Sequence, residues 1–155
     1  MTSTAHRVLV VEDEANIRNL LADMLRFEGY DVATAQNGLH AMALLDGRPS
    51  DVILLDLMMP LMDGFTFRGK QLLSARLADI PVIVLSAKFL VDGELERLRP
   101  FAWLAKPFDV GLLLRAVASA CDDRPVHAAA TPGPGASPIA AGLRPIGVAE
   151  RSQQI

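Results

Sequence analysis

Two hydrophobic periodicities alternate along the first 123 residues, and this alternation restricts the fold more than any other feature. Short apolar runs, such as RVLVVE at residues 7–12 and VILLD at residues 52–56, are typical of buried strands. Between these runs, apolar residues recur at intervals of three and four, as at residues 14–28, which indicates amphipathic helices. Strands that alternate with helices predict a parallel sheet with helices on both faces, an α/β fold.

The pattern sets approximate limits for each element. We expect strands at residues 7–12, 30–35, 51–56, 80–86 and 102–106. We expect helices at residues 14–28, 39–45, 64–77 and 90–98, and a last helix after its cap, Asp109. Right-handed crossovers favour a doubly wound, flavodoxin-like sheet of order 2-1-3-4-5, with a site at the carboxyl ends of its strands.

The composition changes at residue 124. Pro, Gly and Ala make up half of residues 124–155, and no apolar period is sustained there. Such a segment cannot bury enough surface to offset the entropy of ordering it. We therefore predict a folded domain over residues 1–123 and a disordered tail over residues 124–155, with a linear binding motif in the tail as the alternative.

Charge and composition argue against several classes of partner. The net charge is −3, with an isoelectric point near 5.5, which predicts neither a nucleic-acid nor an anionic-membrane surface. The apolar run near the start is too short for a signal peptide, and no segment is long enough to span a membrane. The single cysteine, Cys121, cannot form an internal disulfide. We expect a cytoplasmic protein.

Polar residues follow the strands that flank the expected site. Glu12 and Asp13 follow the first strand, Asp56 ends the third, Ser86 ends the fourth and Lys106 ends the fifth. Each has an ordinary alternative explanation, such as a helix cap for Asp13 or a turn hydroxyl for Ser86. Carboxylates gathered at one sheet edge repel one another and favour a hard cation such as Mg²⁺, which often also meets a phosphate. Asp56 is then a candidate nucleophile for an aspartyl phosphate.

Four motifs in this order carry a family resemblance: VLVVEDE, VILLDLMMPLMDG, VIVLSA and LAKPF. Together they resemble the receiver domain of bacterial two-component response regulators (CheY-like), over about residues 7–122. The resemblance implies that Asp56 accepts a phosphoryl group from a sensor histidine kinase or phosphotransfer protein. It also implies that Glu12, Asp13, Asp56 and the backbone carbonyl of Met58 hold Mg²⁺.

The resemblance assigns further roles near the fifth strand. Lys106 would pair with the acceptor carboxylate and then with the phosphoryl group, and Ser86 would hydrogen-bond a phosphoryl oxygen. Trp103 stands where the family has an aromatic switch residue, although it could be an ordinary core aromatic. A cis peptide bond is expected between Lys106 and Pro107.

One segment departs from the family pattern. RLRPFAW, at residues 97–103, contains Pro100 and lacks the usual glycine, and the stretch from Ser86 to Lys106 is short. We therefore expect a truncated fourth helix and an unusual output face.

Three functions remain open on the sequence alone. The leading hypothesis is a single-domain response regulator that signals to a protein partner by a conformational switch. It would be no enzyme beyond Mg²⁺-dependent self-phosphorylation and autodephosphorylation. The alternatives are a phosphorylation-independent interaction module and an aspartyl-nucleophile phosphohydrolase. Such a hydrolase needs a second Asp two residues after the nucleophile, where this chain has Met58.

Overall fold

The structure is a computed structural model that describes residues 5–123, so the predicted tail at residues 124–155 lies outside the described residues. Strands and helices alternate throughout the described part. The strands are β1 (Arg7–Val11), β2 (Asp31–Ala35), β3 (Val52–Asp56), β4 (Val82–Ser86) and β5 (Ala102–Ala105). The helices are α1 (Ala15–Phe27), α2 (Gly38–Gly47), α3 (Gly64–Leu73), α4 (Asp92–Leu98) and α5 (Val110–Asp123).

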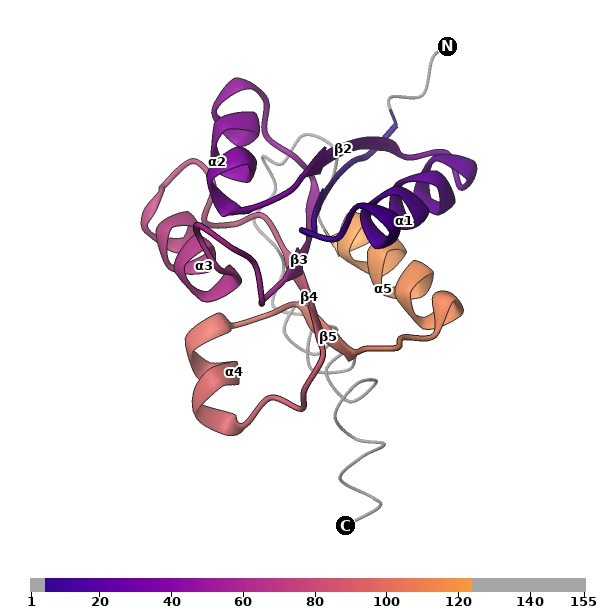
Figure 1. Ribbon diagram of the computed structural model, residues 1–155. Helices are drawn as coiled ribbons and strands as arrows, with labels where there is room; N and C mark the ends of the chain where they lie inside the picture. The colour runs from indigo at the N-terminus through magenta and orange to yellow at the C-terminus, as the bar shows by residue number, and fades with distance from the viewer. Residues whose placement is uncertain (1–4, 124–155) are drawn as a thin grey trace.

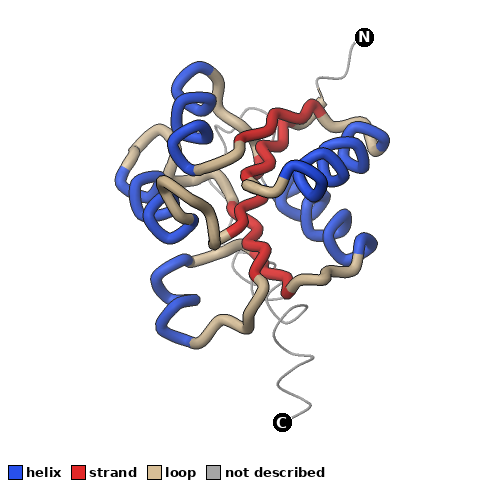
Figure 2. The backbone as a smooth tube through the Cα atoms, viewed as in Figure 1, coloured by secondary structure: helices blue, strands red, loops and turns tan. Residues whose placement is uncertain are grey.

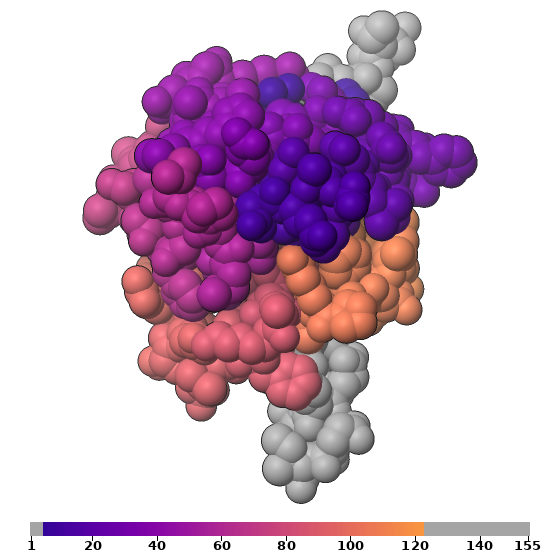
Figure 3. All heavy atoms as spheres, in the orientation of Figure 1, coloured from indigo at the N-terminus to yellow at the C-terminus, as the bar shows by residue number. Residues whose placement is uncertain are grey.

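The five strands form one parallel sheet of order β2-β1-β3-β4-β5, which confirms the predicted topology. Figure 1 shows the sheet with α1 and α5 on one face and α2, α3 and α4 on the other. The same two layers are visible in the tube of Figure 2. In the space-filling view, segments from both layers meet across the middle of the molecule (Figure 3). The order switches between β1 and β3, so the carboxyl ends of these two strands flank the expected crevice.

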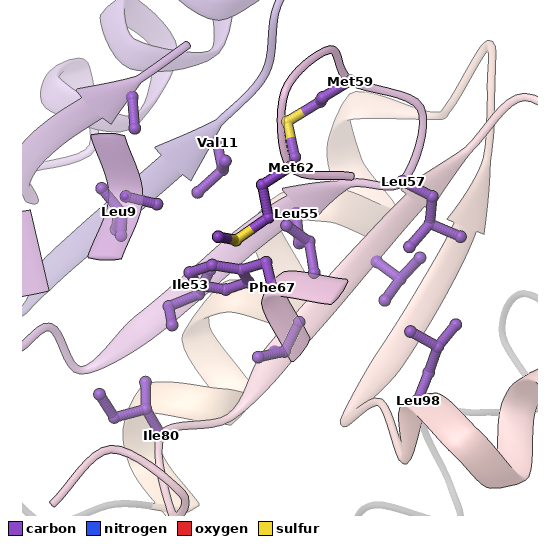
Figure 4. Close-up of a cluster of buried hydrophobic side chains, with 14 of the residues drawn as sticks. Leu9, Val11, Ile53, Leu55, Leu57, Met59, Met62, Phe67, Ile80 and Leu98 are labelled. Atoms are coloured by element: carbon purple, nitrogen blue, oxygen red, sulfur yellow. The ribbon is translucent and has the colours of Figure 1, made fainter. Parts of the chain in front are cut away.

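Alternate residues of each strand supply two separate cores. Leu9 and Ile53 belong to the cluster under α2, α3 and α4, part of which Figure 4 shows. Val10 and Leu54 belong to the cluster under α1 and α5. Full burial of each such side chain is worth roughly 1.5–3 kcal/mol. The sheet is thus fixed from both sides, which holds the ends of its strands in place.

Helix α3 ends at Leu73, four residues earlier than the prediction of a helix to residue 77, which was wrong. The cause is the buried amide of Gln71. Its Nε2 donates to the carbonyls of Leu77 at 2.8 Å and Ile80 at 3.0 Å. These bonds hold the following segment in a turn, which the hydrophobic period alone does not reveal.

Helix α4 begins at Asp92, whereas the prediction placed its start at residue 90. It has only seven residues, so the expectation of a short fourth helix is confirmed. Of the apolar residues that recur in α1, Leu21 and Leu25 are buried, but Leu20 is 57% exposed. Within residues 5–123, none of the helices combines the length and hydropathy that a membrane crossing requires.

Candidate functional site

Three carboxylates come together at the carboxyl ends of β1 and β3. Glu12 and Asp13 follow β1, and Asp56 is the last residue of β3. Each offers an oxygen, and these oxygens lie within 4.8 Å of one another. Glu12 and Asp56 are buried, whereas Asp13 is exposed. Because β1 and β3 are hydrogen-bonded neighbours, the sheet itself brings the acids together.

Lys106, the residue after β5, reaches this acidic group. Its Nζ donates to Glu12 Oε1 at 2.8 Å and lies 3.5 Å from Asp56 Oδ1. The backbone N–H of Lys106 donates to the Ser86 carbonyl at 2.7 Å, and the peptide bond between Lys106 and Pro107 is cis. The lysine head is therefore directed toward the carboxylates, and Glu12 is its nearer partner.

The charges are not balanced within this group. The pKa of Asp56 is raised to about 7, first by burial and then by the Glu12 carboxylate, while Lys106 opposes the rise. Burial lowers the pKa of Lys106, but its hydrogen bond to Glu12 and the negative charge of Asp56 outweigh that effect and raise it. One ammonium thus contacts two of the three acids, Glu12 and Asp56. A buried carboxylate without a full counter-charge is costly. The arrangement favours binding of a further cation.

The donor set fits Mg²⁺. The three acids offer hard oxygen ligands, and the exposure of Asp13 leaves one side of the group open to solvent. Mg²⁺ prefers oxygen ligands, keeps several waters and is often held by one or two carboxylates together with a phosphate. Glu12, Asp13 and Asp56 are thus the described residues that could hold such an ion.

The loop after Asp56 is closed by Gly64. The Gly64 N–H donates to the Leu57 carbonyl at 2.9 Å. A Cβ at Gly64 would lie 2.7 Å from the Asp56 carbonyl oxygen and 2.7 Å from the Leu57 Cα, too close for any side chain. Asp63 caps α3 by accepting from the Thr66 N–H at 2.8 Å. The Asp-Gly pair therefore starts α3 directly against the end of β3.

Met58 differs from the two methionines that follow it. Met59 and Met62 are buried, whereas Met58 is 69% exposed. Its N–H lies 3.4 Å from Asp56 Oδ1, as a long hydrogen bond. The Met58 side chain therefore stands at the rim of the site, and its backbone lies beside the Asp56 carboxylate.

Arg18 supports the acidic loop and was missed by the sequence reasoning. Its guanidinium donates to the carbonyls of Glu12 at 2.8 Å and Asp13 at 3.2 Å. Glu14, which precedes α1, makes no side-chain cap, so α1 begins without the Asp13 cap considered above. An arginine one turn into the helix after an acidic pair is the only sequence signal for this contact.

Ser86 and Trp103 contact other groups in this structure. The Ser86 hydroxyl donates to the Lys88 carbonyl at 2.8 Å and accepts from the Lys88 N–H at 3.2 Å. Trp103 is buried in the core beneath α2, α3 and α4. Its ring meets that of Phe89 edge-on, with centroids 6.3 Å apart. In this structure, Ser86 therefore has the contacts of a turn hydroxyl, and Trp103 has those of a core aromatic.

Comparison with known protein sequences gives a consistent picture. Residues 8–118 match the family model of the response regulator receiver domain. The chain is 37% identical over 113 residues to the DNA-binding dual master transcriptional regulator RpaA of Synechocystis sp., across 72% of this chain and 47% of that protein. It is 40% identical over 115 residues to the transcriptional regulatory protein PdtaR of Mycobacterium tuberculosis, across 72% and 54%. The chain therefore spans about half the length of these relatives.

Solved structures show the same likeness. The chemotaxis protein CheY4 of Vibrio cholerae superposes with a TM-score of 0.71 at 29% identity. The superposition covers 76% of this chain and 99% of that protein. A Francisella response regulator receiver domain superposes with a TM-score of 0.67 at 29% identity, over 76% of this chain and 97% of that one.

Proposed function

We propose that this chain, which belongs to the response regulator receiver domain family, accepts a phosphoryl group on Asp56 from a sensor histidine kinase or a phosphotransfer protein. The observation that carries the proposal is the acidic group of Glu12, Asp13 and Asp56 with the Lys106 ammonium against it. Receiver domains are phosphoacceptor switches in signal transduction. The chain retains each charged group that such chemistry needs.

In the proposed transfer, an Asp56 carboxylate oxygen attacks the phosphorus of a phosphohistidine. The new O–P bond forms as the P–N bond breaks, and the imidazole leaves with the electron pair of that bond. Lys106 lies 3.5 Å from the acceptor carboxylate, close enough to stabilise the charge that gathers on the phosphoryl oxygens. The donor is the partner's phosphohistidine, so no further reactant is required.

We propose Mg²⁺ as the cofactor, held by Glu12, Asp13, Asp56 and the backbone carbonyl of Met58. Bound there, it would neutralise negative charge shared by the carboxylates and the phosphoryl oxygens.

The same proposal assigns phosphoryl recognition to Ser86 and Lys106, and a switch role to Ser86 and Trp103. The Ser86 hydroxyl lies at the end of β4, one strand from Asp56, which supports its part.

The output is proposed to be a protein partner bound in a phosphorylation-dependent way, in the cytoplasm, without catalytic turnover beyond self-phosphorylation and autodephosphorylation. The exposed Met58 two residues after Asp56 provides no acid for a phosphohydrolase.

We also propose that residues 1–123 form the receiver domain and that residues 124–155 form a tail outside it. The end of the family match at residue 118 supports that division.

Incubation with Mg²⁺ and acetyl phosphate tests the acceptor. We expect one phosphoryl group on the wild type, lost on base treatment, and none on Asp56→Ala, by intact mass spectrometry. Asp23→Ala is the matched control, because the Asp23 side chain is 78% exposed on α1. It should be labelled as the wild type is. Equal labelling of Asp56→Ala and the wild type would exclude Asp56 as the acceptor.

A further inference from the structure

The Ser86 hydroxyl makes two hydrogen bonds with the backbone of Lys88. It donates its proton to the Lys88 carbonyl at 2.8 Å and accepts from the Lys88 N–H at 3.2 Å. A hydroxyl carries one proton, so Ser86 cannot keep the first of these bonds and also donate to a phosphoryl oxygen. Any contact of Ser86 with a phosphoryl group therefore changes the turn that contains Lys88.

The Lys88 side chain extends this connection to α4. Its Nζ donates to Glu94 Oε1 at 2.7 Å, and Glu94 Oε2 accepts from the Val91 N–H at 3.1 Å. One carboxylate in the first turn of α4 therefore binds both the turn after Ser86 and the residue that precedes the helix. The Ser86 hydroxyl and the start of α4 are thus linked through contacts among four residues, Ser86, Lys88, Glu94 and Val91.

The two ends of α4 are held in different ways. At its C-terminal end, the buried Arg68 of α3 donates to the carbonyls of Leu98 at 2.7 Å and Arg99 at 2.8 Å. Arg97 also lies over the Phe65 ring, 4.9 Å from its centroid. Arg97, Leu98 and Arg99 are the first three residues of the unusual RLRPFAW segment.

At the N-terminal end of α4, the ion pair with Lys88 is exposed, since 60% of the lysine side chain is accessible. Exposed ion pairs are weak, whereas buried charged hydrogen bonds are costly to break. The N-terminal end is therefore the end that can be released.

We infer that the Lys88–Glu94 ion pair is a latch that holds the first turn of α4 in the unphosphorylated arrangement. This inference rests on the proposed function, whose regulation it describes. When Ser86 turns to a phosphoryl oxygen, the Lys88 carbonyl loses the hydrogen bond that the Ser86 hydroxyl donates to it. The turn that contains Lys88 then changes, and the Lys88 ammonium is no longer held against Glu94. The last turn of α4 stays bound to Arg68, so α4 responds at its N-terminal end.

The latch sets the direction of the expected effect. A contact present in only one of two conformers shifts their populations by its own strength. Exposed pairs of this kind change an equilibrium by roughly two- to fivefold. Because the latch stabilises the unphosphorylated conformer, its removal should make the protein bind a phosphoryl analogue about two- to fivefold more tightly.

Titration of the full chain with beryllofluoride in Mg²⁺ tests the latch, with Trp103 fluorescence as the signal. Trp103 is the only tryptophan, and it contacts Phe89, the residue after Lys88. The variants are Lys88→Met, Glu94→Gln and the double variant. Glutamine keeps an oxygen that can accept from the Val91 N–H, so the start of α4 stays capped. Lys70→Met, on the exposed surface of α3, is the control for the lost charge.

We expect both single variants to bind beryllofluoride more tightly and the double variant to match either single, because one pair is broken in all three. Lys70→Met should bind as the wild type does. Weaker binding by Lys88→Met would mean that Lys88 contacts the phosphoryl group itself and would overturn the latch. Unchanged binding by both single variants would also overturn it, while a normal wild-type response would leave the proposed function standing.

Amide hydrogen exchange without any phosphoryl analogue separates the two proposals. Glu94→Gln should speed exchange in the first turn of α4 and leave the Leu98 and Arg99 amides unchanged. Equal exchange in Glu94→Gln and the wild type would overturn the latch, whatever the outcome with beryllofluoride. A wild type that gives no response to Mg²⁺ and beryllofluoride would overturn the proposed function and the latch with it.

Discussion

Asp56 occupies a position that is unfavourable for a carboxylate when no metal is bound. The four residues before it, 52–55, are completely buried, and Asp56 itself is only 4% exposed. The buried Glu12 carboxylate shares the single ammonium of Lys106, which it contacts more closely than Asp56 does. The acid is thus held rigidly where its charge is poorly compensated, a common arrangement at functional sites.

This cost gives a prediction for the stability of the metal-free protein. Folding raises the pKa of Asp56 from 3.8 to about 7, so the folded state binds the proton more tightly. The free energy of unfolding of the wild type should therefore fall as the pH rises from about 4 to about 7. Asp56→Asn should be more stable at pH 8 by about 1–2 kcal/mol, after allowance for solvent screening, and the difference should shrink at pH 5.

Urea unfolding in EDTA at the two pH values measures this difference. Asp23→Asn is the matched control, since its exposed carboxylate should leave stability within about 0.5 kcal/mol of the wild type. Added Mg²⁺ should stabilise the wild type more than Asp56→Asn, because a ligand that binds only the folded state raises its stability. A less stable Asp56→Asn at pH 8 without metal would refute the argument from burial.

At the scale of elements, α3 depends on a close approach that only glycine permits. A Cβ at Gly64 would meet backbone atoms of Asp56 and Leu57 at 2.7 Å, and backbone cannot move aside as a side-chain end can. Gly64→Ala should therefore lower the free energy of unfolding by about 1–3 kcal/mol, as overpacking does. On the proposed function, it should also slow phosphoryl labelling, since the acceptor residue must shift.

Gly69 in the same helix is the matched control for this substitution. No atom lies within 4 Å of a Cβ placed there. Gly69→Ala should therefore raise the stability by up to about 1 kcal/mol, through the helix propensity of alanine. Urea unfolding of the two variants distinguishes the effects, and equal stability would show that the approach at Gly64 is unimportant.

The sequence predicted which elements exist better than it predicted where they end. Periodicity depends on which residues face the core, and that pattern identified all ten elements of residues 5–123. The ends depend on particular side-chain contacts, which the periodicity does not reveal. Gln71 stops α3 through carbonyls six and nine residues later, and Glu94 fixes the start of α4.

For the candidate site, too, the sequence predicted the general placement of residues better than their particular contacts. The rule of strand carboxyl ends placed Glu12, Asp13, Asp56 and Lys106 together, because parallel strands end at one edge. Arg18 was missed, since its bonds go to backbone carbonyls, which every residue carries. The roles of the site residues in phosphoryl transfer, and of Ser86 and Trp103 in switching, stay predictions.

At the scale of the whole molecule, the sheet divides the interior into two cores that a reagent cannot reach without opening a helical layer. Cys121 belongs to the core under α1 and α5, together with Leu21 and Leu113. The residue is only 3% exposed. Access to Cys121 therefore reports on the separation of α1 and α5 from the sheet.

Burial also controls the chemistry of this thiol, because only the thiolate reacts with alkylating reagents. Burial, and then the charges of Asp51 and Asp122, raise the pKa of Cys121 from 9.0 to about 12. In the unfolded chain, alkylation by iodoacetamide should accelerate as the pH rises from 8 to 10, through the ordinary pKa. In the folded protein the thiol stays protonated over that range, so alkylation should be at least about 10³-fold slower and should follow unfolding.

Mass spectrometry of samples quenched over time, with and without urea, measures both rates. Cys121→Ala controls for alkylation elsewhere, because the chain has no other cysteine. If the two halves of the interior open together, the labelling rate should rise with urea as the global unfolding equilibrium does. Labelling that is fast in native buffer, or insensitive to urea, would mean that α5 separates from the sheet independently, and that the two cores are not one cooperative unit.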